Sequence, residues 1–412
     1  MKKLLLLLGC ISAMSVSAQR QCVTDKQMKR FFDKNTVAAA NKESLRNFLI
    51  TNDYGKNAKA ETVVTIPVVV HVLYKNNTQN VSDAQIMSQL KVLNDDFRKV
   101  NANFNTIVPD AFKPMAADLE LAFTLATKKP DGTATTGIER KSVSSSFNFG
   151  NNYYKTSGLP AWDPTKYLNI WVGKFDGYDE YGDPWAGTLG FAYLPDAAGE
   201  PYDGLCIGYD SFGTMGTASA PFNLGRTGTH EIGHYFGLNH IWGDEENSCG
   251  TSAGDDGCAD TPATKEPYFD TPTYPTNKYA CTTTATGSMF MNYMDYVDDK
   301  SMGMFTNDQK TITKNTLLGP RASLLTLGVN DIETSKSINV YPNPAGHFIS
   351  ISSPLVKISE VEIFNTEGKL VKTAKLQSQN EQIDVKQLPV GIYYLRTYDQ
   401  GNLVKSMKFV KK

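Results

Sequence analysis

Three of the chain's five histidines, His230, His234 and His240, lie in one short stretch. On a helix, residues four apart point in nearly the same direction, so His230 and His234 would present their imidazoles side by side. A continued helix would turn His240 away from them. Gly237 tolerates positive φ without strain and is therefore expected to bend the chain, so that the third imidazole returns to the other two. The spacing predicts three nitrogen ligands that meet at one point.

Three neutral imidazoles suit zinc, and a site with three protein ligands leaves the fourth position open for water, as in a catalytic centre. Glu231 directly follows the first ligand and is placed to take a proton from that water as a general base. The short motif alone often marks only an amphipathic helix. With 5 histidines in the whole chain and three of them here, chance placement is a poor account. The pattern predicts one catalytic Zn²⁺.

The longer pattern HExxHxxGxxH resembles that of the metzincin metalloproteases, in which a methionine-bearing turn lies beneath the metal. Met294, within residues 292–296, provides such a turn. Together with residues 240–244 and 260–262, it resembles the pappalysin family, specifically its smaller bacterial members, over most of residues 60–325. The resemblance implies a cleft between an upper sheet subdomain and an irregular lower one. It also implies that Tyr296 donates a hydrogen bond to the developing oxyanion.

Composition sets outer limits on the kind of protein this is. A chain of 412 residues is expected to form two or three domains, and its net charge of −2 favours neither nucleic acid nor an anionic membrane surface as partner. Two lysines, an apolar stretch to Val16 and the small Ala18 predict a secretory signal peptide at 1–18, with Cys10 as a weaker lipoprotein alternative. The stretch is too short to span a bilayer, so the mature protein is expected to lack a transmembrane segment.

Residues 19–60 are polar, lysine-rich and only weakly helical in pattern, with Thr24 as a candidate helix cap, which predicts a pro-segment. The resemblance implies that Cys22 is a cysteine switch, whose thiolate occupies the open metal position and keeps the enzyme latent. Val23 stands where glycine is expected in that switch. Removal of the signal peptide leaves an odd number of cysteines, so a stray thiol or an intermolecular disulfide is the alternative for Cys22.

The elements that must position the metal helix are visible as periodic patterns. A capping box at Ser82 and Gln85 opens a helix with an apolar face, and residues 190–193 form either an edge strand that receives the substrate backbone or a strand fragment with a turn. Strands interleaved with helices predict an α/β (α+β) catalytic domain with a mixed sheet over 61–325. The predicted strands lie within 61–74, 119–125 and 167–172.

The irregular region, residues 243–288, holds few apolar side chains and contains several of the cysteines. The resemblance implies a disulfide between Cys249 and Cys281. Cys206 and Cys258 remain candidates for a second pair. These crosslinks would stabilise a segment that has too few apolar residues to pack unaided.

The resemblance places two groups of acidic residues beside the predicted cleft. The resemblance implies that Asp256 and Thr261, and less strongly Asp260, bind Ca²⁺, while a solvated acidic loop is the alternative. It also implies that Asp299, with Asp298 as the neighbouring alternative, lies at the base of the pocket for the residue after the scissile bond. A carboxylate there would pair with arginine and, less well, with lysine.

After residue 326 the chain changes to short β-patterned runs separated by turns, which predict a small all-β sandwich at 326–412. The motif Tyr-Pro-Asn-Pro at 341–344, residues 388–393 and the basic end resemble the sorting domain of the type IX secretion system. The resemblance implies export across both membranes, to the cell surface or beyond it. A binding or adhesion module is the alternative.

The patterns together favour a secreted zinc endopeptidase, made as a latent zymogen and acting on protein or peptide substrates. The competing hypothesis is a metal-binding surface adhesin built on an inactive protease domain. The intact Glu231 argues against that hypothesis, because a protein that only binds metal has no need of a general base beside it.

Overall fold

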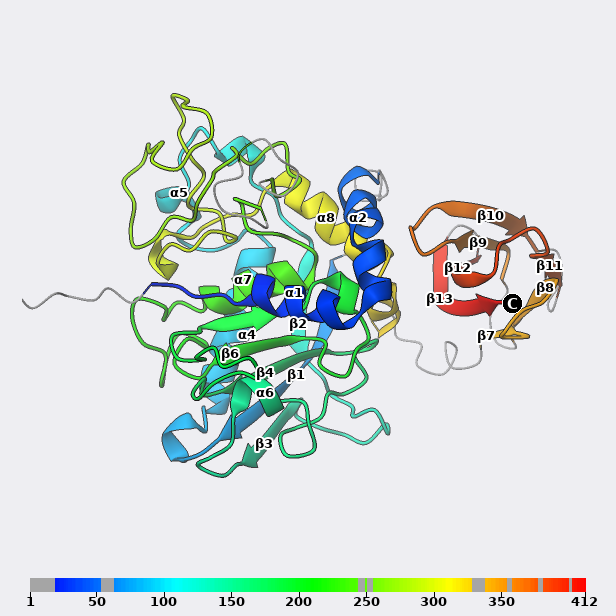
Figure 1. Cartoon of the computed structure of the whole chain (residues 1–412), viewed down its shortest axis with the longest axis horizontal. Coiled ribbons are helices and arrows are strands. Elements are labelled where there is room, and N and C mark those ends of the chain that lie inside the picture. The colour runs from blue at the N-terminus through cyan, green and yellow to red at the C-terminus, as the bar shows by residue number, and fades with distance from the viewer. Residues whose placement is uncertain are drawn as a thin grey trace, which may run out of the picture.

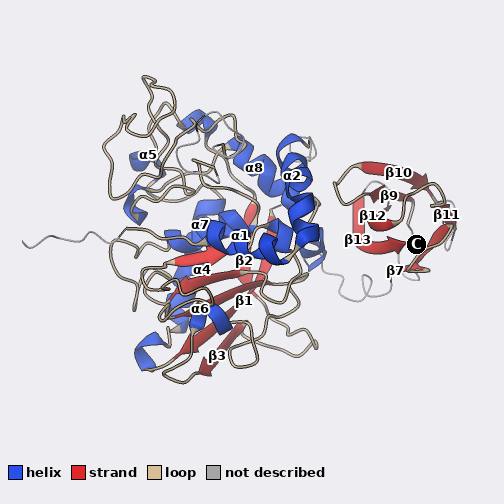
Figure 2. Cartoon of the chain, in the orientation of Figure 1, coloured by secondary structure: helices blue, strands red, loops and turns tan. Residues whose placement is uncertain are grey.

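The computed structural model describes residues 19–52, 63–243, 249, 255–327, 338–353, 358–376, 381–399 and 402–412. A larger body of helices and sheet and a smaller body of strands are visible in Figures 1 and 2. The predicted signal peptide, the predicted end of the pro-segment near residue 60 and position 244 of the family motif lie outside the described residues.

A mixed sheet forms the centre of the larger body, as predicted. The strand order is β2-β1-β4-β6-β5, with β3 pairing β1 further along, and every pair is parallel except β5 with β6. β5 is the last strand in this order and is therefore an edge strand of the sheet. The strands are β1 (Val64–Tyr74), β2 (Leu121–Leu125), β3 (Ile138–Ser142), β4 (Leu168–Gly173), β5 (Gly190–Ala192) and β6 (Leu205–Gly208).

Helix α4 (Asp83–Phe97) begins where the capping box predicts, since the Ser82 side chain accepts a hydrogen bond from the Gln85 backbone at 3.2 Å. Its apolar face packs on the sheet and on α7 (Arg226–Tyr235), the helix of the histidine motif. Helix α8 (Asn307–Leu318) closes the larger body. The short elements are α5 (Phe104–Ile107), α6 (Phe149–Asn152), η1 (Asn77–Gln79), η2 (Lys113–Met115), η3 (Pro195–Ala197), η4 (Asp299–Ser301) and η5 (Ala322–Leu327).

The N-terminal segment is more helical than its sequence pattern suggests: it forms α1 (Thr24–Lys34) and α2 (Thr36–Thr51). Met28 and Phe31 of α1 are buried against the larger body, and the Leu49 carbonyl of α2 accepts a hydrogen bond from Asn315 of α8. Packing of this kind stabilises helices whose own propensity is weak. The prediction that Thr24 caps α1 is wrong, because Val23 is the cap and no side chain bonds there.

The region between α7 and η4 has no helix or strand among its described residues, in line with its composition. Cys249 and Cys281 form the predicted disulfide. The suggested second pair is wrong: Cys206 and Cys258 are both free and buried. Cys206 lies on β6 in an aromatic cluster, whereas Cys258 belongs to the main core, so each sulfur packs among different apolar side chains.

The smaller body consists of two antiparallel sheets, as predicted for its β-sandwich. Their inner faces share one core, to which Ile351, Leu395 and Phe409 contribute. One sheet has the order β10-β9-β12-β13 and the other β11-β8-β7. The strands are β7 (Asn339–Tyr341), β8 (Phe348–Ser352), β9 (Glu360–Phe364), β10 (Leu370–Lys375), β11 (Gln382–Asp384), β12 (Gly391–Asp399) and β13 (Asn402–Lys411).

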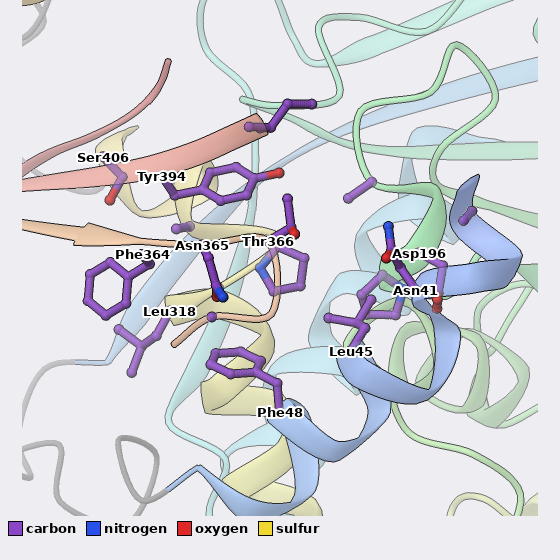
Figure 3. A pocket seen from close by; sticks show the side chains of 18 of the residues that line it. Asn41, Leu45, Phe48, Asp196, Leu318, Phe364, Asn365, Thr366, Tyr394 and Ser406 are labelled. Carbon is purple, nitrogen blue, oxygen red and sulfur yellow. The ribbon is translucent and has the colours of Figure 1, made fainter. Parts of the chain in front are cut away.

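Phe48 of α2 contacts both bodies. A Cβ added to Gly319, at the end of α8, would lie 2.6 Å from its ring, and one added to Gly368, in the turn after β9, would lie 2.2 Å from it. A cavity of about 340 Å³ adjoins this contact and is lined from α2, from the end of α8 and from the four-stranded sheet (Figure 3). The N-terminal segment thus lies between the two bodies at this point.

Candidate active site

The three histidines of the motif meet because α7 stops between them. His230 and His234 project from α7, which ends before Gly237, and Gly237 has φ +91° as its predicted role requires. The chain then returns His240 to the other two. The Nε2 atoms of His230 and His234 are 3.2 Å apart, and those of His234 and His240 are 3.1 Å apart. All three side chains are buried.

The outer nitrogens of two imidazoles are held by the backbone. His230 Nδ1 donates to the Tyr293 carbonyl and His234 Nδ1 to the Leu238 carbonyl, both at 2.7 Å. Burial lowers the pKa of His234 to about 3 and the pKa of His230 well below its usual value, so both rings are neutral. Since a carbonyl only accepts, each proton lies on Nδ1, and each Nε2 presents a lone pair to the other. Facing lone pairs call for a cation between them.

His240 completes the set. Its Nδ1 lies 2.9 Å from Asp25 Oδ2, and its ring stacks on Trp242 with centroids 4.4 Å apart. Tetrahedral zinc with bonds of about 2.0–2.1 Å would separate its ligand nitrogens by roughly 3.3 Å, close to the separations observed. The Cys22 sulfur belongs to the same group, whose ligand atoms all lie within 4.8 Å of one another. The donor set therefore fits zinc with a thiolate in the fourth position.

Cys22 lies between the histidines and Glu231. Its Sγ is 3.5 Å from Glu231 Oε2, and the Thr24 hydroxyl donates to the same oxygen at 3.3 Å. Burial raises the pKa of Glu231 to about 8, against the lowering effect of these hydrogen bonds and of the Arg20 charge. Burial and the neighbouring Glu231 raise the pKa of the Cys22 thiol as well, so a thiolate at this place requires a cation beside it.

The segment around Cys22 pairs with the edge strand β5. The Val23 amide donates to the Gly190 carbonyl at 3.3 Å, and the Leu189 amide donates to the Gln21 carbonyl at 3.0 Å. The bridge between Cys22 and Gly190 is parallel. The backbone of the N-terminal segment thus pairs with β5. One of the two predictions for residues 190–193 was that the substrate backbone would pair with this same edge.

Tyr296 lies on the other side of the cluster. Its hydroxyl donates to the Cys22 carbonyl at 3.0 Å, and its ring centroid lies 4.9 Å from that of His240. Burial raises the pKa of Tyr296 well above its usual value, and the nearby Cys22 adds to the effect. The hydroxyl therefore keeps its proton and can act as a donor to a carbonyl oxygen at this position.

Met294 packs directly on α7 between the two helical histidines. It is fully buried, and a Cβ added to Gly233 would lie 2.4 Å from its sulfur. Gly233, which has no side chain, thus allows the turn that carries Met294 to approach α7 closely. The sequence pattern did not predict this role for Gly233. The turn supports the ring of His230 through the carbonyl of the preceding residue, Tyr293.

The two candidate pocket acids differ in their surroundings. Asp299 is fully buried, and its Oδ2 accepts from the Leu224 amide at 2.8 Å and from the Arg226 amide at 3.2 Å, where α7 begins. Asp298 is directed elsewhere, with its Oδ2 accepting from the Thr271 hydroxyl at 3.2 Å. The structure therefore brings only Asp299 to the start of the metal helix.

Arg20 is a residue that nothing in the sequence pattern singled out. Its side chain is buried, and its Nη2 donates to Asp299 Oδ1 at 2.5 Å. It also donates to the Thr227 hydroxyl at 3.1 Å and to the Val297 carbonyl at 3.4 Å, and its guanidinium lies 5.0 Å from the Phe222 ring centroid. The only sequence signal was its place two residues before Cys22. The guanidinium thus lies against Asp299, the residue that the resemblance places at the base of the substrate pocket.

The predicted calcium residues lie apart from this cluster. Asp256 is buried, with Oδ1 accepting from the Cys258 amide at 2.9 Å and from the Thr261 hydroxyl at 2.8 Å. Burial raises the pKa of Asp256 to about 8. Asp260 points toward α8 and accepts from the Asp308 amide at 3.0 Å. The structure brings Asp256 and Thr261 together and leaves Asp260 to the helix.

Of the helices in the described parts of the chain, none is long and apolar enough to cross a bilayer.

Comparisons with known proteins show which proteins this chain resembles. The sequence model described as pregnancy-associated plasma protein-A, a peptidase family, matches residues 153–317. Promirolysin of Tannerella forsythia, solved as a variant, is 36% identical, with a TM-score of 0.63, and the match covers 74% of this chain and 96% of that one. Mature mirolysin with a cleaved peptide is 40% identical, with a TM-score of 0.57, over 65% of this chain and 97% of that one.

An extracellular metalloprotease of Arthroderma gypseum is 26% identical over 309 residues, which is 73% of this chain and 86% of the relative. Residues 339–412 match the secretion system C-terminal sorting domain. The chain belongs to the pappalysin family of metzincin metalloproteases. It is an exported metalloendopeptidase, sorted by the type IX secretion system, and its family implies zinc as the catalytic metal.

Proposed function

We propose that the chain is the latent precursor of a zinc endopeptidase that cleaves proteins on the amino side of arginine and, less often, of lysine. In this proposal residues 1–18 are the signal peptide, 19–60 the pro-segment, 61–325 the catalytic domain and 326–412 the sorting domain. His230, His234 and His240 would hold zinc, which when bound polarises a water molecule and the peptide carbonyl. Cys22 would occupy the fourth position in the latent form.

Two side chains carry the proton transfers and the charge. Glu231 takes a proton from the attacking water and passes it to the leaving nitrogen, as expected of a carboxylate beside the metal ligands. The Tyr296 hydroxyl donates to the carbonyl oxygen as negative charge develops on it. Supporting this role, that hydroxyl already donates to a peptide carbonyl, the one of Cys22, at 3.0 Å.

The proposed preference for arginine rests on the ion pair between Arg20 and Asp299. An arginine of the chain's own pro-segment lies in the pocket, with its guanidinium shared among Asp299, Thr227 and the Val297 carbonyl. Three acceptors arranged around a planar fork favour arginine, because the single ammonium of lysine would leave some of them without a donor. A substrate arginine is proposed to occupy the same place after the pro-segment has left.

The test is the set of cleavage sites in a peptide library, determined with enzyme freed of its pro-segment. Arginine, then lysine, is expected after the scissile bond, and a set of sites without this preference would overturn the specificity. Casein hydrolysis should be lost in Glu231→Ala while metal analysis still finds one zinc per chain. Undiminished hydrolysis by that variant contradicts the mechanism, and a wild type that binds zinc without hydrolysing casein supports the adhesin alternative.

Calcium is proposed as a second, structural ion. Asp256 and Thr261 offer adjacent oxygens, and a buried carboxylate whose pKa lies near 8 is costly to ionise unless a cation accompanies it. A calcium ion beside Asp256 would remove that cost.

A further inference from the structure

Each of the three ligand imidazoles has its outer nitrogen held, but the holders come from different parts of the chain. The Tyr293 and Leu238 carbonyls, which hold His230 and His234, belong to the catalytic part. The third holder is the Asp25 carboxylate, 2.9 Å from His240 Nδ1, and it belongs to α1 of the N-terminal segment. Proteolytic activation would leave two of these contacts in place and remove the third.

We propose that Asp25 is a positioning residue for the metal centre, which fixes the tautomer and ring orientation of His240 while the precursor captures zinc. This inference rests on the zinc site proposed above. A carboxylate that accepts the Nδ1 proton directs the Nε2 lone pair to the metal and makes that nitrogen a stronger ligand. The N-terminal segment then supplies both the fourth ligand, Cys22, and the support of the third.

The position of Asp25 suits this role. It lies in the first turn of α1, three residues after Cys22, where the partial positive charge of the helix end stabilises a carboxylate. The buried Met28 and Phe31 fix α1 against the larger body, so the carboxylate approaches His240 from a fixed element and not from a loose tail. On its other face His240 stacks on Trp242. The ring is thus held from two sides in the precursor and from one side after activation.

Zinc capture is consequently a task of the precursor. When the N-terminal segment leaves, His240 loses its carboxylate partner at the same time as the fourth position opens. The mature enzyme should therefore regain zinc less readily than the precursor after both have been stripped of metal. The same segment that blocks the site also assembles it.

The test uses the full chain in a Glu231→Ala background, so that no hydrolysis can remove the segment. Zinc affinity is measured by competition with a chelator, and Asp25→Ala is expected to weaken it by about 10–100-fold, the usual effect of losing such a partner. Asp25→Asn, whose amide oxygen can still accept the Nδ1 proton, should recover most of the affinity. Asp33→Ala, which removes an exposed carboxylate from the same helix, is the matched control and should change nothing.

Folding does not confound the measurement, since 43% of the Asp25 side chain is solvent-exposed and its loss leaves no cavity. The comparison is repeated with Cys22→Ala present, which separates the support of His240 from the thiolate. If Asp25→Ala holds zinc as tightly as Asp33→Ala in both backgrounds, the inference is wrong although the zinc site stands. If the parent protein itself takes up no zinc, the proposed function is what has failed.

Discussion

Asp299 makes two kinds of contact: one with the guanidinium of Arg20 and one with backbone amides. Loss of the first should change substrate preference, whereas loss of the second should disturb the loop before α7. Its Oδ1 receives Arg20, while its Oδ2 accepts from two backbone amides at the start of α7. Loss of a buried, hydrogen-bonded charge contact costs about 2–5 kcal/mol. Asp299→Ala should therefore lower kcat/KM for arginine peptides by roughly 30-fold or more, with little change for peptides that carry an apolar residue after the scissile bond.

Asp298→Ala is the matched control, because its carboxylate is directed to Thr271. Asp299→Asn keeps an acceptor for the Leu224 and Arg226 amides and removes only the charge, so it should show the same selective loss. Equal weakening of both peptide classes by Asp299→Ala would mean that Asp299 only holds the loop before α7.

If calcium binds beside Asp256 as proposed, the stability of the fold should depend on both pH and calcium. Its pKa is raised to about 8 in the folded chain, against about 3.9 in an unfolded one. Between these values the unfolded state loses the proton that the folded state keeps, so the calcium-free protein becomes less stable as pH rises from about 4 to 8. Added calcium should raise the Tm in a calorimetric scan, more at pH 8 than at pH 5.

In Asp256→Asn that calcium-dependent increment should vanish, while the pH dependence between 4 and 8 becomes shallower. A Tm that rises equally with calcium in both proteins would place the ion elsewhere.

At the scale of elements, the N-terminal segment is held to the site by several contacts of different kinds. Cys22 faces the histidines, its neighbours pair with β5, and Arg20 pairs with Asp299. If the thiolate occupies the open metal position, Cys22→Ala precursor should process itself earlier than wild type, as followed by gel analysis over time. The N-terminal segment should still block the site in part in this variant, because its pairing with β5 and the contact of Arg20 with Asp299 remain.

Cys22→Ser is the companion variant, since serine keeps the size and loses the thiolate. Identical latency in the wild type and in both variants would retire the cysteine switch in favour of simple steric blocking.

Strands β1, β2 and β4 of the catalytic sheet and helices α4 and α7 could be predicted because their patterns are local, whereas β3, β6 and α8 were not predicted. The apolar run of β1, the capping box of α4 and the histidine spacing of α7 each follow from the period of one element. Helices α1 and α2 could not be predicted as firmly, because contacts with residues far along the chain stabilise them. The role of Thr24 also depends on residues far along the chain: its hydroxyl donates to Glu231 and accepts from the Ala192 amide, and it does not cap α1.

The site divides in the same way. Motif spacing suffices to bring His230, His234 and His240 together, and family resemblance points to Tyr296. The partners of these residues are non-local: Arg20 lies 279 positions from Asp299, and Asp25 lies 215 positions from His240. No period within one element encodes such a pair. The prediction of a second disulfide was wrong for a related reason. Cys206 and Cys258 pack in different clusters, and the sequence pattern does not reveal this.

At the scale of the whole molecule, the C-terminal sheets have their own core and match a sorting domain. Deletion of residues 338–412 should stop surface delivery while the catalytic part still folds, because the two cores share no residue. Cell fractionation with antibody detection measures delivery, and zinc content of the retained protein reports folding. Normal export of the truncated chain would instead support the adhesion-module alternative.

Phe48 links α2 of the N-terminal segment to both bodies. Its ring touches Gly319 at the end of α8 and Gly368 beside β10, so the helix of the N-terminal segment that carries it is held by two surfaces while the sheets remain attached. If the C-terminal sheets were removed, the side of the Phe48 ring that faces Gly368 would be uncovered, and α2 would lose that contact. Removal of the sorting sheets should therefore make the N-terminal segment easier to release from the catalytic part.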